Sequence, residues 1–147
     1  MATPQLSNFN VLIVDDEKQI QRLVYDVLAS LGFRNIVVAN SGRRAMELMD
    51  KQKFDFIITD WRMQDLDGIE IVRYARQMMD SKHMTTPIIM LTGNTEPHYV
   101  ITARDAGANG YVLKPFSATQ LVKRIRVVIE NPVPFILAPK YHGPDRR

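Results

Sequence analysis

The 147-residue sequence predicts a doubly wound α/β domain, in which helices cover both faces of a five-stranded parallel sheet. Three observations predict this class. Strand-like and helix-like segments alternate along the chain. The strand-like segments are short and almost continuously apolar, as expected for strands covered on both faces. The segments between them carry apolar residues at 3- and 4-residue spacings, which is the helical period. Such units connect through right-handed crossovers.

Five apolar runs define the expected strands. They are Asn10–Val14, Asn35–Ala39, Phe54–Asp60, Pro87–Leu91 and Gly110–Leu113. The flavodoxin-like strand order 2-1-3-4-5 is the natural arrangement, because it places the ends of the first and third strands side by side at the switch point of the sheet.

Five helices are expected between and after these strands. The first runs from Glu17 to Leu31 and stops at Gly32, and Ser41 is a suitable N-cap for the second. Gly68 opens the third helix. Pro97 suits the first turn of the fourth helix, which ends at Gly107, and Ser117 caps the last.

Length and composition indicate one cytoplasmic domain with a short tail. We expect an N-terminal extension over residues 1–8, a folded domain over 9–130, and a Pro-containing basic tail over 131–147. No apolar run reaches the roughly 20 residues that cross a bilayer, no signal peptide is visible, and cysteine is absent. The net charge is +3, and the tail contributes +2 of it. The nearly neutral body gives no electrostatic reason to expect direct nucleic-acid binding.

Polar groups stand at the carboxyl ends of four of the expected strands. Asp15 and Asp16 follow the first, Asp60 ends the third, Thr92 follows the fourth and Lys114 follows the fifth. Ligands of open parallel sheets bind at this edge. We therefore expect three carboxylates, a hydroxyl and an ammonium to meet in one crevice.

The chemistry of this group favours phosphoryl transfer with Mg²⁺. Three carboxylates at close range are costly unless some are protonated or a cation lies among them, and carboxylate oxygens favour Mg²⁺. Lys114 and Thr92 suit a phosphoryl group in transfer. Asp60 stands alone on the central strand and is the best nucleophile, while the adjacent Asp15 and Asp16 suit the metal. Taken singly, each residue has an ordinary explanation as a helix cap, a turn or a solvated charge. The ordered set at successive strand ends favours the site.

These residues resemble the receiver domain of two-component response regulators, especially the stand-alone chemotaxis type. That type is itself a standard example of the strand order given above. The resemblance covers roughly residues 8–130. It rests on Val14-Asp15-Asp16, Thr59-Asp60-Trp61, Asp67-Gly68, Leu91-Thr92-Gly93, Asp105-Ala106-Gly107-Ala108 and Lys114-Pro115-Phe116.

The resemblance implies a role for each site residue. Asp60 would accept a phosphoryl group from a sensor histidine kinase. Asp15, Asp16, Asp60 and the backbone carbonyl of Arg62 would hold Mg²⁺. Thr92 and Lys114 would contact the phosphoryl group, and Tyr111 would swing inward when Thr92 moves. A cis bond between Lys114 and Pro115 is also implied.

Two departures from the family are visible. Gln64 stands four residues after Asp60, where the family commonly has proline. Arg62 and Asn94 occupy positions that in the family tune the lifetime of the phosphoryl group, so that lifetime is not transferred.

The leading interpretation is a phosphorylation-controlled switch that is not an enzyme beyond its own phosphorylation and dephosphorylation. It would signal to a target protein through the last helix and last strand, with the helix that starts near Pro97. One alternative is a phosphorelay intermediate that passes phosphate to a histidine phosphotransfer protein. Another is an Mg²⁺-dependent aspartyl phosphatase, which would need an acid where Arg62 stands.

The tail is either disordered or an extended segment that packs Phe135, Ile136 and Leu137 on the domain and presents Arg146 and Arg147 to a partner. Kinase, target and oligomeric state stay open.

Overall fold

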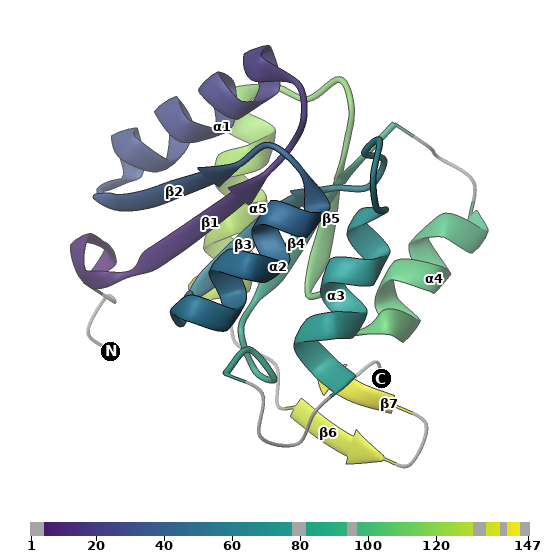
Figure 1. The fold of residues 1–147 in the computed structure, drawn as a ribbon. Helices are drawn as coiled ribbons and strands as arrows, with labels where there is room; N and C mark the ends of the chain where they lie inside the picture. The colour runs from purple at the N-terminus through teal and green to yellow at the C-terminus, as the bar shows by residue number, and fades with distance from the viewer. Residues whose placement is uncertain (1–4, 78–81, 94–96, 131–134, 139–140, 145–147) are drawn as a thin grey trace.

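A single five-stranded parallel sheet organises the domain (Figure 1). The computed structural model describes residues 5–77, 82–93, 97–130, 135–138 and 141–144. The strands follow the order β2-β1-β3-β4-β5, as predicted. Their bounds are β1 Asn10–Val14, β2 Asn35–Ala39, β3 Phe56–Asp60, β4 Ile88–Thr92 and β5 Gly110–Leu113.

Five helices pack on the two faces of this sheet. They are α1 Lys18–Leu31, α2 Gly42–Lys51, α3 Gly68–Gln77, α4 Pro97–Ala106 and α5 Ala118–Glu130, and a 3-10 turn, η1 Leu6–Asn8, precedes β1. α1 and α5 contact each other, and α3 contacts both α2 and α4. The two groups cover opposite faces of the sheet (Figure 1).

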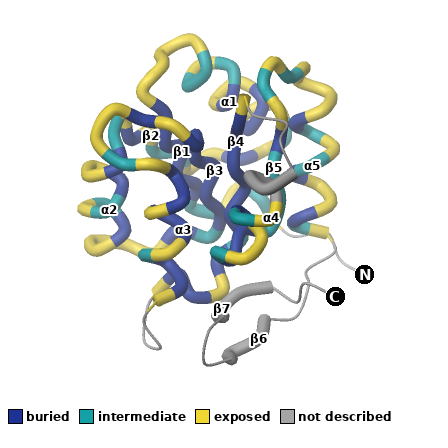
Figure 2. The backbone as a smooth tube through the Cα atoms, turned by 90° about the vertical axis from the view of Figure 1, so that its right-hand side faces the viewer, coloured by how far each residue is buried: buried dark blue, intermediate teal, exposed yellow. Residues whose placement is uncertain are grey.

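Two apolar clusters, one on each face, form the core. Val24 and Leu28 of α1 meet Leu121 and Ile125 of α5 beneath one face, and the residues of α2, α3 and α4 pack beneath the other. The strands β3 and β4 are buried along their whole length, as Figure 2 shows by its dark central tubes.

The edge strands differ from the prediction that all five would be covered. Val38 in β2 is 37% exposed and Leu113 in β5 is 38% exposed, because an edge strand has a neighbour on one side only.

Local signals begin and end the helices as the sequence predicts. Gly32 and Gly107 adopt φ values of 107° and 111°, the left-handed conformation that glycine accepts without strain. The Ser41 hydroxyl accepts a hydrogen bond from Arg44 N at 3.1 Å. Ser117 and Gln120 form a reciprocal capping box before α5.

The C-terminal segment forms a structure that the sequence did not predict. β6 Phe135–Ala138 and β7 Tyr141–Pro144 pair as an antiparallel hairpin, and β7 lies against α3 and α4. The hairpin is at the end of the domain away from the carboxyl ends of the parallel strands (Figure 1). The two expectations for the tail, a disordered end or an extended segment that packs on the domain, did not include a hairpin, although the contacts of β7 with α3 and α4 place this part of the tail against the domain. The packing of Phe135, Ile136 and Leu137 lies outside the described side chains, and Arg146 and Arg147 lie outside the described residues.

Candidate functional site

Strand register brings the predicted polar residues together. Val14 of β1 is aligned with Thr59 of β3, and Asp60 is aligned with Leu91 of β4. The residues that follow these strands therefore meet at one edge. The crevice there has a volume of ≈ 340 Å³, and it is lined by Glu17, Asp60, Trp61, Arg62, Thr92, Gly93 and Lys114.

Three carboxylates converge in this crevice. Asp15, Asp16 and Asp60 each place an oxygen within 4.8 Å of the others. Asp15 and Asp60 are buried, whereas Asp16 is exposed. Asp15 Oδ1 accepts a hydrogen bond from Glu17 N at 2.8 Å. Asp15 Oδ2 is buried and accepts no hydrogen bond from the described residues.

Lys114 supplies the positive charge of the site. Its Nζ lies 2.9 Å from Asp60 Oδ1 and 3.7 Å from Asp15 Oδ2, so it hydrogen-bonds the first carboxylate and pairs only electrostatically with the second. Burial alone would lower the pKa of Lys114. The hydrogen bond to Asp60 and the charge of Asp15 outweigh burial, so the pKa is raised above its usual value. Lys114 is therefore a permanent cation. The Lys114–Pro115 bond is cis, which confirms the prediction.

The two buried carboxyls are poorly stabilised as anions. Burial raises the pKa of Asp15 to about 6, and the charge of Asp60 adds to the effect. Burial also raises the pKa of Asp60, although the hydrogen bond and charge of Lys114 oppose the shift. One ammonium therefore does not compensate the negative charge of the cluster.

These residues fit a divalent cation. The orphaned Asp15 Oδ2 needs a partner, and Asp16 and Asp60 place further hard oxygens near it. Mg²⁺ prefers one or two carboxylates and keeps several waters, which a crevice open to solvent on the Asp16 side allows. A cation there would also remove the repulsion that raises the two pKa values.

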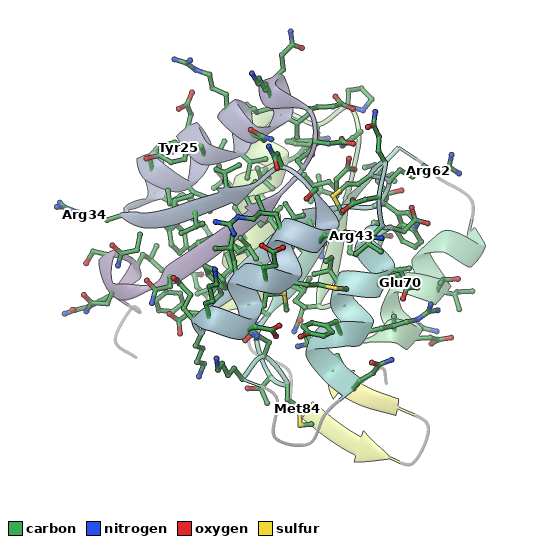
Figure 3. All side chains as sticks on the ribbon, in the orientation of Figure 1. Tyr25, Arg34, Arg43, Arg62, Glu70 and Met84 are labelled. Carbon is green, nitrogen blue, oxygen red and sulfur yellow. The ribbon has the colours of Figure 1, made fainter. Side chains whose placement is uncertain are left out.

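The loop between β3 and α3 is held close to Asp60. Trp61 N donates to Leu91 O at 2.8 Å, and Gly68 N donates to Trp61 O at 2.6 Å. A Cβ at Gly68 would lie 2.1 Å from the Asp60 carbonyl oxygen, so only glycine permits this approach. Arg62 extends outward from this loop (Figure 3). The sequence placed Gly68 at the start of a helix but gave no sign of this contact.

Thr92 and Tyr111 lie on the neighbouring strands β4 and β5, and the relay between them stays a prediction. Thr92 is buried at the end of β4, and its carbonyl accepts from Lys114 N at 2.7 Å. Tyr111 is half-buried in β5, with the Arg124 guanidinium 6.0 Å from its ring centroid. Tyr111 also lines a groove between β5 and α5, together with Val112, Leu113, Pro115, Gln120, Lys123, Arg124 and Val127.

A buried polar network that sequence reasoning missed ties α3 to the opposite end of the sheet. The Arg76 guanidinium donates to the carbonyls of His83, Thr86 and Gly107 and to Asn109 Oδ1. Its partners lie up to 33 residues away in the chain, so no local pattern indicates them. None of these four hydrogen bonds involves a residue that lines the crevice.

Comparison with known proteins identifies the class of this domain. Residues 11–126 match the family model of the response regulator receiver domain. The chain belongs to that family, which confirms the resemblance. Receiver domains are signalling proteins of two-component systems, and they generally bind Mg²⁺ at an acidic pocket.

The relatives include single-domain chemotaxis regulators. The chain is 37% identical over 124 residues to chemotaxis protein CheY-3 of Vibrio cholerae, covering 84% of this chain and 94% of that protein. It is 38% identical over 121 residues to chemotaxis protein CheY of Pseudomonas aeruginosa, covering 82% and 96%. Within the described part of the chain, no helix is both long and apolar enough to cross a membrane.

Solved structures show the same fold. CheY4 of Vibrio cholerae superposes with a TM-score of 0.74 at 36% identity, covering 82% of this chain and 98% of that one. The receiver domain of a Pseudomonas aeruginosa sensor histidine kinase has a TM-score of 0.72 at 29% identity, covering 84% and 98%. That structure has a magnesium ion coordinated in its active-site cleft.

Proposed function

We propose that this protein is a phosphorylation-controlled switch. Asp60 accepts a phosphoryl group from a sensor histidine kinase with Mg²⁺, and the phosphorylated domain binds a target protein. The observation that carries the proposal is the position of Lys114 Nζ, 2.9 Å from Asp60 Oδ1 and beside two further carboxylates. This arrangement suits a phosphoryl group that arrives at Asp60 with its negative charge spread over three oxygens.

The transfer step uses the residues of the crevice. A carboxylate oxygen of Asp60 forms a bond to phosphorus while the phosphorus–nitrogen bond of the donor histidine breaks, and the histidine nitrogen keeps the electron pair. Lys114 and the Thr92 hydroxyl then face the phosphoryl oxygens. Asp15, Asp16, Asp60 and the Arg62 carbonyl would hold Mg²⁺, which when bound neutralises charge on the transferred group. The domain thus promotes only its own phosphorylation and dephosphorylation, in the cytoplasm where such kinases present their phosphohistidine.

The output surface is the groove between β5 and α5. Thr92 moves toward the phosphoryl oxygens and Tyr111 fills the space that it leaves, so the state of the crevice alters the wall of the groove. The groove combines exposed apolar side chains, with Val127 49% and Leu113 38% exposed, and the cations Lys123 and Arg124. Such a mixed surface suits a protein partner, and phosphorylation selects it only if the partner binds the two states differently.

Capture experiments test this function. Wild-type protein phosphorylated with acetyl phosphate and Mg²⁺ should capture a target that the unphosphorylated protein does not. Val127→Asp and Thr92→Ala should both accept the phosphoryl group and lose that capture. The first changes only the groove, and the second removes the hydroxyl through which the crevice acts on Tyr111 but leaves Asp60, Lys114 and the carboxylate cluster in place. Phosphorylation-independent capture, or full capture by both variants, would contradict the switch. Recovery of a histidine phosphotransfer protein that removes the phosphoryl group would instead support a relay.

A further inference from the structure

The loop that follows Asp60 is fastened to a second helix by one carboxylate. Asp65 Oδ1 accepts a hydrogen bond from Gly42 N at 3.0 Å, and Asp65 Oδ2 accepts from Arg43 N at 2.9 Å. Gly42 and Arg43 are the first two residues of α2. Their amides have no acceptor within their own helix, and a carboxylate at that end also interacts favourably with the helix dipole.

This contact completes a cap that α2 does not make alone. Ser41 is the N-cap by sequence position, and its hydroxyl accepts only from Arg44 N. The remaining two amides are satisfied from the β3–α3 loop, more than 20 residues further along the chain. Asp65 therefore has two partners that stay fixed as long as α2 is folded. The backbone hydrogen bonds from Arg43, Gly42 and Leu66 outweigh burial and lower the pKa of Asp65, so it is a carboxylate at neutral pH.

An apolar contact at the next residue strengthens the attachment. A Cβ at Gly42 would lie 2.8 Å from Leu66 Cβ, so the Leu66 side chain rests directly on the first turn of α2. Leu66 N also donates to Asp65 Oδ1 at 2.8 Å, which fixes the carboxylate relative to its own loop. Asp65 and Leu66, which are consecutive in the loop, thus contact the N-terminal end of α2, the first through hydrogen bonds and the second through an apolar contact.

A short span of loop next to Asp60 lies between two of these attachments. Trp61 is held at one end by Leu91 O, and Asp65 is held at the other by α2. Only residues 62–64 lie between these points, and they include the Arg62 carbonyl that the proposed function assigns to Mg²⁺. Gln64 does not restrict its own φ as a proline would, so the position of this span depends on its contacts, which include the buried Met63 side chain and the attachments at its two ends.

From these contacts we infer that Asp65 is a positioning residue for the metal site. Asp65 is not among the residues that line the crevice. It holds the β3–α3 loop against α2, so that the Arg62 carbonyl faces the carboxylate cluster. This inference rests on the proposed function, because the site must bind Mg²⁺ for its positioning to matter.

The test compares three variants of the full chain by Mg²⁺ titration. Trp61 is the only tryptophan and is adjacent to Asp60, so Mg²⁺ binding should change its fluorescence. Asp65→Ala should weaken Mg²⁺ binding about tenfold, the lower end of what outer-shell partners contribute to metal affinity. Asp65→Asn keeps the oxygen that faces Gly42 N and loses the one that faces Arg43 N, so its affinity should lie between those of Asp65→Ala and the wild type. It also provides a folded variant if Asp65→Ala does not fold.

Ser41→Ala is the matched control. It removes one hydrogen bond from the same end of α2 without touching the loop, so it should lower stability yet leave Mg²⁺ affinity unchanged. Amide exchange of residues 62–64 should quicken in the Asp65 variants only. Equal Mg²⁺ affinity in wild type and both Asp65 variants would overturn the inference while leaving the proposed function intact. An equal loss in Ser41→Ala would overturn it too, because the effect would then be one of helix stability. A wild-type protein that binds no Mg²⁺ would remove the proposed function and the inference together.

Discussion

At the scale of single residues, the crevice contains carboxyl groups whose burial disfavours their ionised form. Asp15 is fully buried, and its Oδ2 has an ammonium at 3.7 Å but no hydrogen bond from the described residues. Such an atom costs stability in the free domain and becomes favourable only when a cation arrives. Perturbed carboxyls of this kind are common at functional sites.

We expect Asp15→Asn to stabilise the metal-free protein at neutral pH. The native pKa of Asp15 is raised from 3.8 to about 6, so the native state binds more protons than the unfolded state between these values. The cost of ionising Asp15 therefore grows as pH rises from 3.8, is complete above about 6, and is worth about 1–3 kcal/mol. Urea unfolding in EDTA measures the gain, which should vanish below pH 4. A variant that is less stable at pH 7, or that still gains stability from Mg²⁺ as wild type does, would contradict this account of Asp15.

His83 should give the opposite pH dependence. It is 2% exposed, its Nε2 accepts from Phe54 N at 3.0 Å, and its ring stacks on that of Phe54. Burial, followed by the charges of Lys82, Lys53 and Arg76, lowers its pKa from 6.5 to about 4. Between these values the unfolded state binds the extra proton, so about 3 kcal/mol of stability is lost as pH falls from about 6.5 to about 4.

The measurement is the difference between wild type and His83→Gln, whose amide oxygen can accept from Phe54 N but does not titrate. Taking the difference removes the contribution of Asp15, which has the opposite sign. The variant should lose less stability than wild type between pH 6.5 and 4. Parallel curves for the two proteins would show that His83 does not titrate as its contacts indicate.

At the scale of elements, the β3–α3 connection is the part of the fold most closely fitted to the site. It runs from Asp60 to Gly68 and is hydrogen-bonded to β4 through Trp61, to α2 through Asp65, and across its own ends between Gly68 and Trp61. The close approach of Gly68 to the Asp60 carbonyl sets where α3 begins. The geometry of Asp60 and the start of the helix are therefore coupled.

Gly68→Ala should disturb both stability and metal binding. The added Cβ has no room at 2.1 Å from a backbone oxygen, so α3 or the end of β3 must shift. We expect a loss of about 2–4 kcal/mol together with weaker Mg²⁺ binding by Trp61 fluorescence. Gly93→Ala is the control at the same crevice, because a Cβ there meets nothing within 4 Å. If the two variants behave alike, the close approach at Gly68 is not what positions Asp60.

The sequence predicted the elements of this fold and the members of the crevice for one physical reason. Continuous apolar runs located the strands, and the carboxyl ends of parallel strands meet at one edge, so Asp60 and Lys114 could be placed together from residues 54 apart in the chain. The contacts of Asp65, Gly68 and Arg76 could not be predicted, because each joins side chain or backbone to a distant partner through detailed geometry. The β6–β7 hairpin was also missed, since its short strands carry little periodicity.

At the scale of the whole molecule, the two ends of the sheet carry different structures. The carboxyl end holds the charged crevice, and the opposite end holds the Arg76 network and the hairpin, with β7 against α3 and α4. α4 also lies beside β5, whose other neighbour α5 forms the proposed output groove. The hairpin is therefore next to α4, which contacts β5 of the proposed output surface, and lies at the end of the sheet away from the crevice.

Deleting residues 133–147 should leave phosphorylation of Asp60 intact, because no described contact joins the hairpin to the crevice. The deletion should weaken target capture or self-association, because it uncovers α3 and α4 where β7 lies. Intact-mass measurement after acetyl phosphate treatment follows the first property. Capture and sedimentation follow the second. A truncated protein with unchanged capture and unchanged sedimentation would show that the tail has no part in either.

The central claim is that Asp60 is phosphorylated in an Mg²⁺-dependent reaction, and intact-mass spectrometry tests it most directly. Wild type treated with acetyl phosphate and Mg²⁺ should gain one phosphoryl group, and it should gain none when EDTA replaces Mg²⁺. Asp60→Asn, which keeps the size of the side chain and removes the nucleophile, should gain none in either condition. A phosphoryl group that appears in Asp60→Asn as in wild type, or that appears equally without Mg²⁺, would contradict the account.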